Sequence, residues 1–322
     1  MKNVISLSEL AKRIKAEKRV ALILHIRPDG DTLGSALALK VALINLGVGA
    51  EVFCDDPVPS RFLFLKAPRE VKAELDGDYS AIIAIDCADI SRLGKFEKDF
   101  IAHKNTYSID HHISNTRYAK YNYVVDNSSN CENVFNLINQ LGVEITEEIA
   151  NLLMMGVMTD TGNFRHRNVT ENTFSTAAVL KDKGADVTDI YYHMFSAQTK
   201  ERAALFGKVM SKIRYFYDGR IAVATVRFTD FSDTGAKQDE TEGFIDFVMG
   251  IKGVEIGACV METSPNKYKI SFRSKSADVN AVAGTFGGGG HTLASGCQIT
   301  GDYEEVVDRI TFAASREIPD SL

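Results

Sequence analysis

The chain of 322 residues is long enough for two domains, each with a core of its own. Its content of 45% apolar and 25% charged residues excludes the disordered, collagen-like and fibrous classes. With 37 Lys and Arg against 43 Asp and Glu, the formal net charge is −6, so the chain lacks the positive field that holds long duplex nucleic acid by its phosphates.

The predicted elements of the first half alternate between strands and helices. Short apolar runs predict strands at 20–24, 52–53 and 81–85, and a further strand is predicted at 106–109. Helical periodicity predicts four helices, over 33–46, 131–141, 146–158 and 172–183. This order is typical of an α/β fold, in which a parallel sheet carries helices on both faces.

The second half follows a different order. Residues 186–210 keep a helical pattern without a strand, and we interpret them as a helical connector. Beyond them the pattern predicts strands at 212–217, 221–227, 254–262 and 267–273, a helix at 240–250, and then a glycine-rich stretch. We therefore expect a parallel-sheet domain at 1–185, the connector, and a smaller α/β domain with a mixed sheet at 211–322.

Features of the sequence also indicate a compartment. The first ten residues hold no apolar run of signal-peptide length, and no window reaches the length of a membrane span, so we expect a cytoplasmic protein without membrane contact. The five cysteines are odd in number and widely spaced, which fits neither a disulfide framework nor a structural zinc site. Any nucleic-acid partner is expected to be short or held locally.

Ionisable side chains gather where the predicted strands end. They are His25, Asp29 and Asp31 after the first strand, Asp86 after the third, and Asp110, His111 and His112 after the fourth. Asp160 follows the helix predicted at 146–158. A single Asp in a turn is usually a cap, and a single His is usually a structural polar residue. Four segments ending in the same chemistry are hard to explain that way, and ligands of open α/β sheets bind at these strand ends.

The carboxylates of this set need compensating charge. Asp29, Asp31, Asp86 and Asp160 would repel one another if they met at one point, and two divalent cations match their four charges. Oxygen and imidazole ligands without thiolate favour Mn²⁺, with Mg²⁺ or Co²⁺ as alternatives. A pair of such ions activates water for in-line displacement at phosphorus. The predicted reaction class is phosphoester hydrolysis.

The order of these motifs resembles that of a known superfamily. His25-x-x-x-Asp29-x-Asp31, Asp86, Asp110-His111-His112 and Asp160 in Thr-Asp-Thr-Gly resemble the four motifs of the DHH phosphoesterases. Phe272-Arg-Ser274, Asp278-Val-Asn280 and the glycine-rich segment 286–296 resemble the associated substrate domain. The two-domain length is most similar to the bacterial nanoRNase and 3′-phosphoadenosine-5′-phosphate phosphatase group, which cleaves very short oligoribonucleotides and linear dinucleotides to mononucleotides.

The resemblance implies a role for each residue of the first domain. One Mn²⁺ would be held by His25, Asp29 and Asp86, and the other by Asp31, Asp86, His111 and Asp160. Asp86 would then bridge the two ions. Asp110 would orient the neighbouring imidazoles. His112, free of metal, would donate a proton to a phosphate oxygen or to the leaving 3′-oxygen.

The glycine run of the second domain is a candidate anion site. Gly287, Gly288, Gly289 and Gly290 leave backbone N–H groups unshielded, and a helix starting after them would complete an anion cradle. A close-packed turn is the structural alternative. Arg273 can donate two N–H bonds to a phosphate, and the resemblance places it and His291 opposite the metals across the cleft between the domains. One phosphate would be held there while the next is cut, which would select dinucleotides.

Other functions stay open at this stage. Hydrolysis of polyphosphate or pyrophosphate calls for several clustered cations, whereas segment 264–300 offers only Lys267, Lys269, Arg273 and Lys275. Hydrolysis of cyclic dinucleotides needs a wider cleft. A catalytically silent nucleotide sensor would have lost a metal ligand, and none is lost.

Two further expectations come from the resemblance. The segment from Ser128 to Asn133 departs from the small-residue turn expected in this family. A homodimer is common among such proteins.

Overall fold

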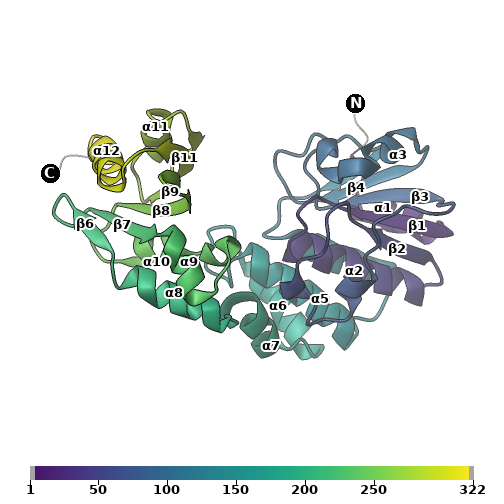
Figure 1. Cartoon of the computed structure of the whole chain (residues 1–322). Coiled ribbons are helices and arrows are strands. Elements are labelled where there is room, and N and C mark those ends of the chain that lie inside the picture. Colours follow the sequence, from purple (N-terminus) through teal and green to yellow (C-terminus); the bar gives the residue numbers. More distant parts are fainter. Residues whose placement is uncertain (1–3, 319–322) are drawn as a thin grey trace. The chain divides into compact units, whose positions relative to one another are not determined.

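The structure is a computed structural model that describes residues 4–318. Internal contacts divide the chain into two compact units, Met1–Ala197 and Gln198–Leu322, and each unit contains a sheet of its own (Figure 1). The α/β fold class predicted from the sequence is confirmed. Among the described residues, no helix is long and apolar enough to cross a bilayer.

The first unit is an open parallel sheet. Its elements are α1 (Leu7–Lys15), β1 (Arg19–Leu24), α2 (Gly30–Asn45), β2 (Gly49–Phe53), η1 (Ser60–Phe62), η2 (Ala67–Glu70), β3 (Ala81–Ile85), η3 (Ile90–Phe96), α3 (Glu97–Ala102), β4 (Thr106–Asp110), β5 (Tyr121–Val124), α4 (Asn130–Leu141), α5 (Glu147–Asp160), α6 (Glu171–Asp182), α7 (Val187–Tyr191) and η4 (Tyr192–Ser196). The strand order is β2-β1-β3-β4-β5, and every pair is parallel.

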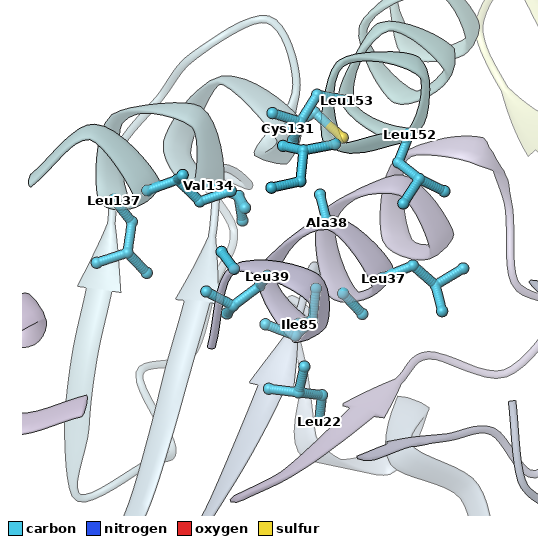
Figure 2. Close-up of a cluster of buried hydrophobic side chains, with 14 of the residues drawn as sticks. Leu22, Leu37, Ala38, Leu39, Ile85, Cys131, Val134, Leu137, Leu152 and Leu153 are labelled. Carbon is cyan, nitrogen blue, oxygen red and sulfur yellow. The ribbon is translucent and has the colours of Figure 1, made fainter. Parts of the chain in front are cut away.

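Both faces of this sheet are buried. Along β1, Val20, Leu22 and Leu24 belong to the larger core, whereas Ala21 and Ile23 belong to a smaller core on the opposite face. Because successive side chains of a strand point to opposite faces, an uninterrupted apolar run is what two covered faces require. In the larger core, side chains of β1 and β3 pack with side chains of α2, α4 and α5 (Figure 2).

The second unit is built on a mixed sheet. Its elements are α8 (Lys200–Met210), β6 (Arg214–Phe216), β7 (Ile221–Val226), α9 (Phe228–Thr234), η5 (Gln238–Thr241), α10 (Phe244–Gly250), β8 (Ile256–Ser264), β9 (Lys267–Ser274), α11 (Val279–Gly284), β10 (Gly289–His291), β11 (Ala294–Thr300) and α12 (Tyr303–Ser315). The strand order is β10-β11-β9-β8-β7-β6. Only the pairing of β7 with β8 is parallel among these described strands.

The segment 186–210, for which a connector is predicted, contains α7, η4 and α8. Its helix α7 belongs to the first unit and α8 to the second. Helices cover both faces of the second sheet: α11 and α12 contribute to one core, and α8 and α10 contribute to the other.

All five cysteines are buried and free.

Candidate active site

The register of the first sheet brings three of the predicted segments to one edge. Leu24 of β1 pairs with Ile85 of β3, and Ile85 pairs with Ile109 of β4. The residues that follow these positions therefore leave the sheet at the same edge. They are His25, Asp86 and the segment Asp110, His111 and His112. Open α/β sheets bind ligands at this edge, outside the carboxyl ends of their strands.

Asp29 is both a helix cap and a member of the site. Its Oδ1 accepts hydrogen bonds from the backbone N–H groups of Asp31 and Thr32, both at 3.1 Å, at the start of α2. Its other oxygen, Oδ2, lies 3.5 Å from Nε2 of His25. The capping function expected for an Asp before a helix thus leaves one oxygen free for the site.

Asp31 is held by the start of another helix. It is 1% exposed, and its two oxygens accept hydrogen bonds from the backbone N–H groups of Asn130 (2.6 Å) and Cys131 (2.9 Å) in the first turn of α4. A helix N-terminus carries partial positive charge, which stabilises a buried carboxylate. The segment from Ser128 to Asn133 therefore positions Asp31 through its backbone N–H groups.

Asp160 reaches the site because α2 and α5 pack closely. It is the last residue of α5, and a Cβ added at Gly30 would overlap the side chain of Thr159. Only glycine at position 30 allows the two helix ends to come this close. The approach places Asp29 and Asp31 of the α2 end beside Asp160.

The gathered side chains form two groups with the spacing of metal ligands. Ligand atoms of His25, Asp29 and Asp86 lie within 4.8 Å of one another, as do those of Asp31, His111 and Asp160. Nε2 of His111 lies 3.4 Å from Asp86 Oδ1, 3.8 Å from Asp31 Oδ2 and 3.7 Å from Asp160 Oδ2. These distances exceed those of normal hydrogen bonds but suit atoms that share an ion. Asp86 belongs to the first group and also lies beside His111 of the second.

The imidazoles of His25 and His111 present Nε2 to the carboxylates of the cluster. Nδ1 of His25 lies 2.8 Å from the carbonyl oxygen of Ile26 and 3.1 Å from Nη2 of Arg92. Nδ1 of His111 lies 3.0 Å from the carbonyl oxygen of Asn127. An imidazole that is held at one nitrogen offers the other in a fixed direction, the usual arrangement of a metal-binding His.

His112 is oriented differently. Its Nδ1 lies 2.7 Å from Asp110 Oδ1, and the other oxygen of Asp110 accepts a hydrogen bond of 2.5 Å from Asn115. Asp110 itself is fully buried. Asp110 thus orients the ring of His112, whereas on His111 it contacts only the backbone N–H. Although Asp86, His111 and His112 also have the spacing of a metal site, Nδ1 of His112 is already taken by Asp110.

The pKa values of the cluster show that its carboxylates are not neutralised by the cationic groups of the chain. Burial and the neighbouring carboxylates of Asp86 and Asp160 raise the pKa of Asp31 well above its usual value. Burial also raises the pKa of Asp160 to about 6, in spite of the opposing charge of His111. Burial lowers the pKa of His25, but Asp29 and Asp86 outweigh it and raise that pKa to about 10. Without another positive charge, the cluster takes up protons.

Asp86 carries the clearest sign of a missing partner. Its Oδ1 is buried and has no hydrogen-bond donor among the described residues. Its backbone has a φ of 57°, a left-handed conformation that is strained for a residue other than glycine. Buried carboxylate oxygens are normally paired. An unpaired oxygen facing imidazole nitrogen at 3.4 Å fits a site built for a cation.

The predicted phosphate-binding residues lie together in the second unit. Arg273 of β9 pairs with Ala294 of β11, and Ala294 pairs with His291 of β10. Arg273 also lines a cavity of about 360 Å³ with Lys269 and Ser271. His291 is exposed. Arg273 and His291 therefore lie on two strands, β9 and β10, that flank β11.

The expectation that a helix starts after the glycine run is wrong. The run instead follows α11 and leads into β10. A Cβ at Gly288 would overlap the backbone of Gly296, and one at Gly290 would overlap Ala294. These two glycines are required by close packing against β11. Gly287 and Gly289 are exposed and have open space or a distant neighbour instead.

Comparisons with known proteins agree with this geometry. The N-terminal domain model of the DHH family matches residues 19–157, and the DHHA1 domain model matches residues 218–318. The bifunctional oligoribonuclease and PAP phosphatase NrnA of Thermus thermophilus is 30% identical over 315 residues, which are 96% of this chain and 93% of that protein. The chain belongs to the DHH family.

Membership of the DHH family confirms the resemblance and the predicted enzyme class, a hydrolase of phosphoester bonds. A probable bifunctional oligoribonuclease and PAP phosphatase NrnA of Streptococcus mutans is 28% identical over 289 residues, 88% of this chain and 90% of that protein. An exopolyphosphatase-related protein from Bacteroides fragilis has a TM-score of 0.82 and 25% identity, covering 96% of this chain and 95% of that structure.

The structure adds residues to the DHH site that the sequence did not indicate. Asn115 and Asn127 hold Asp110 and His111 by the contacts given above, and neither lies in a motif. Four further residues line a cavity beside Asp29 and Asp160; they are Arg61, Phe62, Met194 and Phe195. Segments distant in sequence supply them, so only the folded chain reveals their position.

Proposed function

We propose that this DHH protein is a metal-dependent phosphodiesterase that degrades short oligoribonucleotides and linear dinucleotides to mononucleotides and also hydrolyses 3′-phosphoadenosine-5′-phosphate. The convergence of His25, Asp29, Asp31, Asp86, His111 and Asp160 on one sheet edge carries the proposal. The names of the Thermus and Streptococcus relatives support the choice of substrate. The predicted cytoplasmic location and homodimer stay predictions.

Two Mn²⁺ ions fit the site best. The two groups of ligands bring four carboxylates, whose charge two divalent cations balance, and the unpaired Oδ1 of Asp86 lies where the groups meet. His25, Asp29 and Asp86 would hold one ion; Asp31, Asp86, His111 and Asp160 would hold the other. Mixed carboxylate and imidazole ligands without thiolate favour Mn²⁺, while Mg²⁺ or Co²⁺ are alternatives.

The residues around these ligands supply the remaining steps. When bound, divalent cations would neutralise charge on the phosphate and activate a water molecule for attack on phosphorus. His112, whose Nδ1 is held by Asp110, presents Nε2 as a proton donor to the leaving 3′-oxygen. Arg273 and His291 would bind another phosphate of the substrate; the backbone N–H groups of Gly287, Gly288 and Gly290 already donate to groups of the chain itself.

The first test measures metal binding and turnover together. Protein freed of metal should bind Mn²⁺ in calorimetry, and Asp86→Ala should lose most of that binding together with turnover, on the order of 10⁴-fold. The exposed carboxylate variant Asp182→Ala is the matched control and should behave like the parent protein. Normal turnover by Asp86→Ala, or equal turnover without divalent metal, would reject the metal-dependent mechanism.

The second test compares substrates in the presence of Mn²⁺. The panel contains a dinucleotide, a five-residue RNA, 3′-phosphoadenosine-5′-phosphate, a cyclic dinucleotide and polyphosphate. We expect the dinucleotide to be cut fastest and the phosphoadenosine phosphate to be hydrolysed as well. A preference for the cyclic dinucleotide would reject this substrate assignment.

Polyphosphate hydrolysis is the second candidate, because the Bacteroides structure is described as exopolyphosphatase-related. Against it, the cavity around Arg273 has only one other cation, Lys269, among its described lining residues, and two acidic ones, Asp239 and Glu242. A chain of phosphates would need a longer cationic surface. Polyphosphate as the fastest substrate of the panel would establish this alternative and overturn the proposal.

A further inference from the structure

A cavity of about 200 Å³ opens beside the acidic cluster, within the first unit. One wall consists of residues from the ends of α2 and α5, namely Asp29, Gly30, Thr159 and Asp160. The other wall consists of Arg61, Phe62, Met194 and Phe195. The mechanism above uses none of these last four. An apolar wall next to carboxylates that would hold metal calls for a ligand that is polar at one end and apolar at the other.

The second wall is built by two short segments. Phe62 ends η1 and is only 1% exposed, whereas Met194 and Phe195 lie in η4, a π-helical turn, and are half-buried. The ring of Phe64 stacks on that of His193 with centroids 4.3 Å apart, which joins the two segments. Single π-helical turns are rare and occur frequently at functional sites.

The chemistry of this wall suits a flat aromatic ligand. Phe195 offers a ring, Met194 offers a polarisable sulfur, and both belong to the partly buried shell of the core. The guanidinium of Arg61 lies 5.0 Å from the centre of the Phe62 ring, so it presents a planar cation at the rim. The cavity of about 200 Å³ is open to solvent on one side, so a planar ring can enter it beside the acidic cluster.

We propose that this cavity is a nucleobase subsite, which holds the base of the nucleotide whose phosphate lies at the acidic cluster. The proposal rests on the proposed function and adds a specificity element to it. Phe195 and Met194 contact the face of the base, and Arg61 covers its edge or its sugar phosphate. Base stacking on aromatic side chains tolerates every base, so this subsite binds nucleotides without selecting one base strongly.

The binding experiment compares AMP with ribose 5-phosphate, which has the same phosphate and sugar but no base. In metal-loaded protein, AMP should bind on the order of 10- to 100-fold more tightly. Phe195→Ala should remove most of this preference without weakening ribose 5-phosphate, and Phe195→Tyr should restore it. Phe312→Ala, an exposed Phe of α12 in the second unit, is the matched control and should keep the full preference.

The hydrolysis experiment uses a dinucleotide and two analogues, each lacking one base. Phe195→Ala and Met194→Ala should lower kcat/KM for the full dinucleotide by roughly 10-fold or more. They should leave unchanged the analogue that lacks the base held in the subsite, which also shows that the variants fold. Equal losses on all three substrates, or equal affinity of the parent protein for AMP and ribose 5-phosphate, would overturn the subsite.

These outcomes separate the subsite from the function on which it rests. A parent protein that cuts the dinucleotide but binds AMP no better than ribose 5-phosphate is the proposed hydrolase without this subsite. If the parent protein cuts no dinucleotide, the proposed function fails, and a preference for AMP that Phe195→Ala removes would still support a base-binding cavity.

Discussion

At the scale of single residues, the carboxylates of the site have two different functions. Some are candidate metal ligands, and others orient a neighbouring side chain. Asp86 has a buried oxygen to which no group of residues 4–318 donates, whereas both oxygens of Asp110 have neighbouring donors. Asp110 also lies outside every group of candidate metal ligands among the described residues. Asp110 is better suited to fix the ring of His112 and to stabilise that ring when it is protonated.

Asp110→Asn tests this division of roles. The amide is nearly the same size, but it is uncharged and only its oxygen can accept, so it cannot accept from both His112 Nδ1 and Asn115, and it no longer stabilises a protonated ring. We expect kcat to fall by about 10²- to 10⁴-fold, the range of a lost general acid, with KM nearly unchanged. Calorimetry should show unchanged Mn²⁺ binding, and a loss of that binding would make Asp110 part of the metal site instead.

How far the sequence predicts the site differs between residues. Asp86 could be predicted because it directly follows an apolar strand, and His111 because it belongs to a doubled His behind Asp110 at the end of the next strand. Asn127 could not, since its contribution to the site is a backbone carbonyl oxygen that accepts from His111. Phe195 could not either, because an aromatic residue in a helical segment usually indicates core. Contacts made by loops and backbone leave no pattern in one sequence.

At the scale of elements, the crossing of α2 and α5 determines whether the carboxylates meet. A Cβ added at Gly34 would overlap the backbone oxygen of Leu152 and lie 3.0 Å from Sγ of Cys131. A backbone oxygen within α5 cannot move aside as a side-chain end would. The two helices would separate, and with them Asp31 and Asp160.

Gly34→Ala should therefore lower the stability of the protein, although alanine has a higher helix propensity than glycine. Alanine gains up to about 1 kcal/mol over glycine inside a helix, but overpacking a core costs about 1–3 kcal/mol, and we expect net destabilisation together with reduced activity. Gly207→Ala in α8, where no described atom beyond its own stretch of helix lies within 4 Å of the added Cβ, is the control and should stabilise the protein. Denaturant unfolding measures both, and a stabilised Gly34→Ala would refute the close crossing.

The sequence predicts the central strands of both sheets but misses α1, α3, β5, β11 and α12. The strand at Ala81–Ile85 was predicted with its observed bounds because it is apolar and buried on both faces. The edge strand Tyr121–Val124 was not predicted, since it is short and includes a buried Asn122 that bonds the backbone of Ala119. The glycine run was assigned a helix start because glycine-rich loops often precede helices. Its positions instead allow β10 and β11 to approach closely.

At the scale of the whole molecule, the chain contains separate cores in its two units. Leu22 and Ile83 belong to a core formed only by residues of the first unit, and Ile270 and Phe272 belong to one formed only by residues of the second. Hydrophobic stabilisation is therefore gained within each unit. Two units with their own cores can open at different free energies, which native-state hydrogen exchange resolves by segment.

Phe272→Ala should therefore destabilise one unit selectively. Truncating this fully buried ring costs about 3–5 kcal/mol, so amide exchange should accelerate across β7, β8, β9 and β11 and stay unchanged in β1, β3 and β4. Ile83→Ala, also fully buried, is the reciprocal control and should accelerate exchange only in the first sheet. Equal acceleration of both sheets by either variant would mean that the chain unfolds as one cooperative unit, contrary to the separation of its cores.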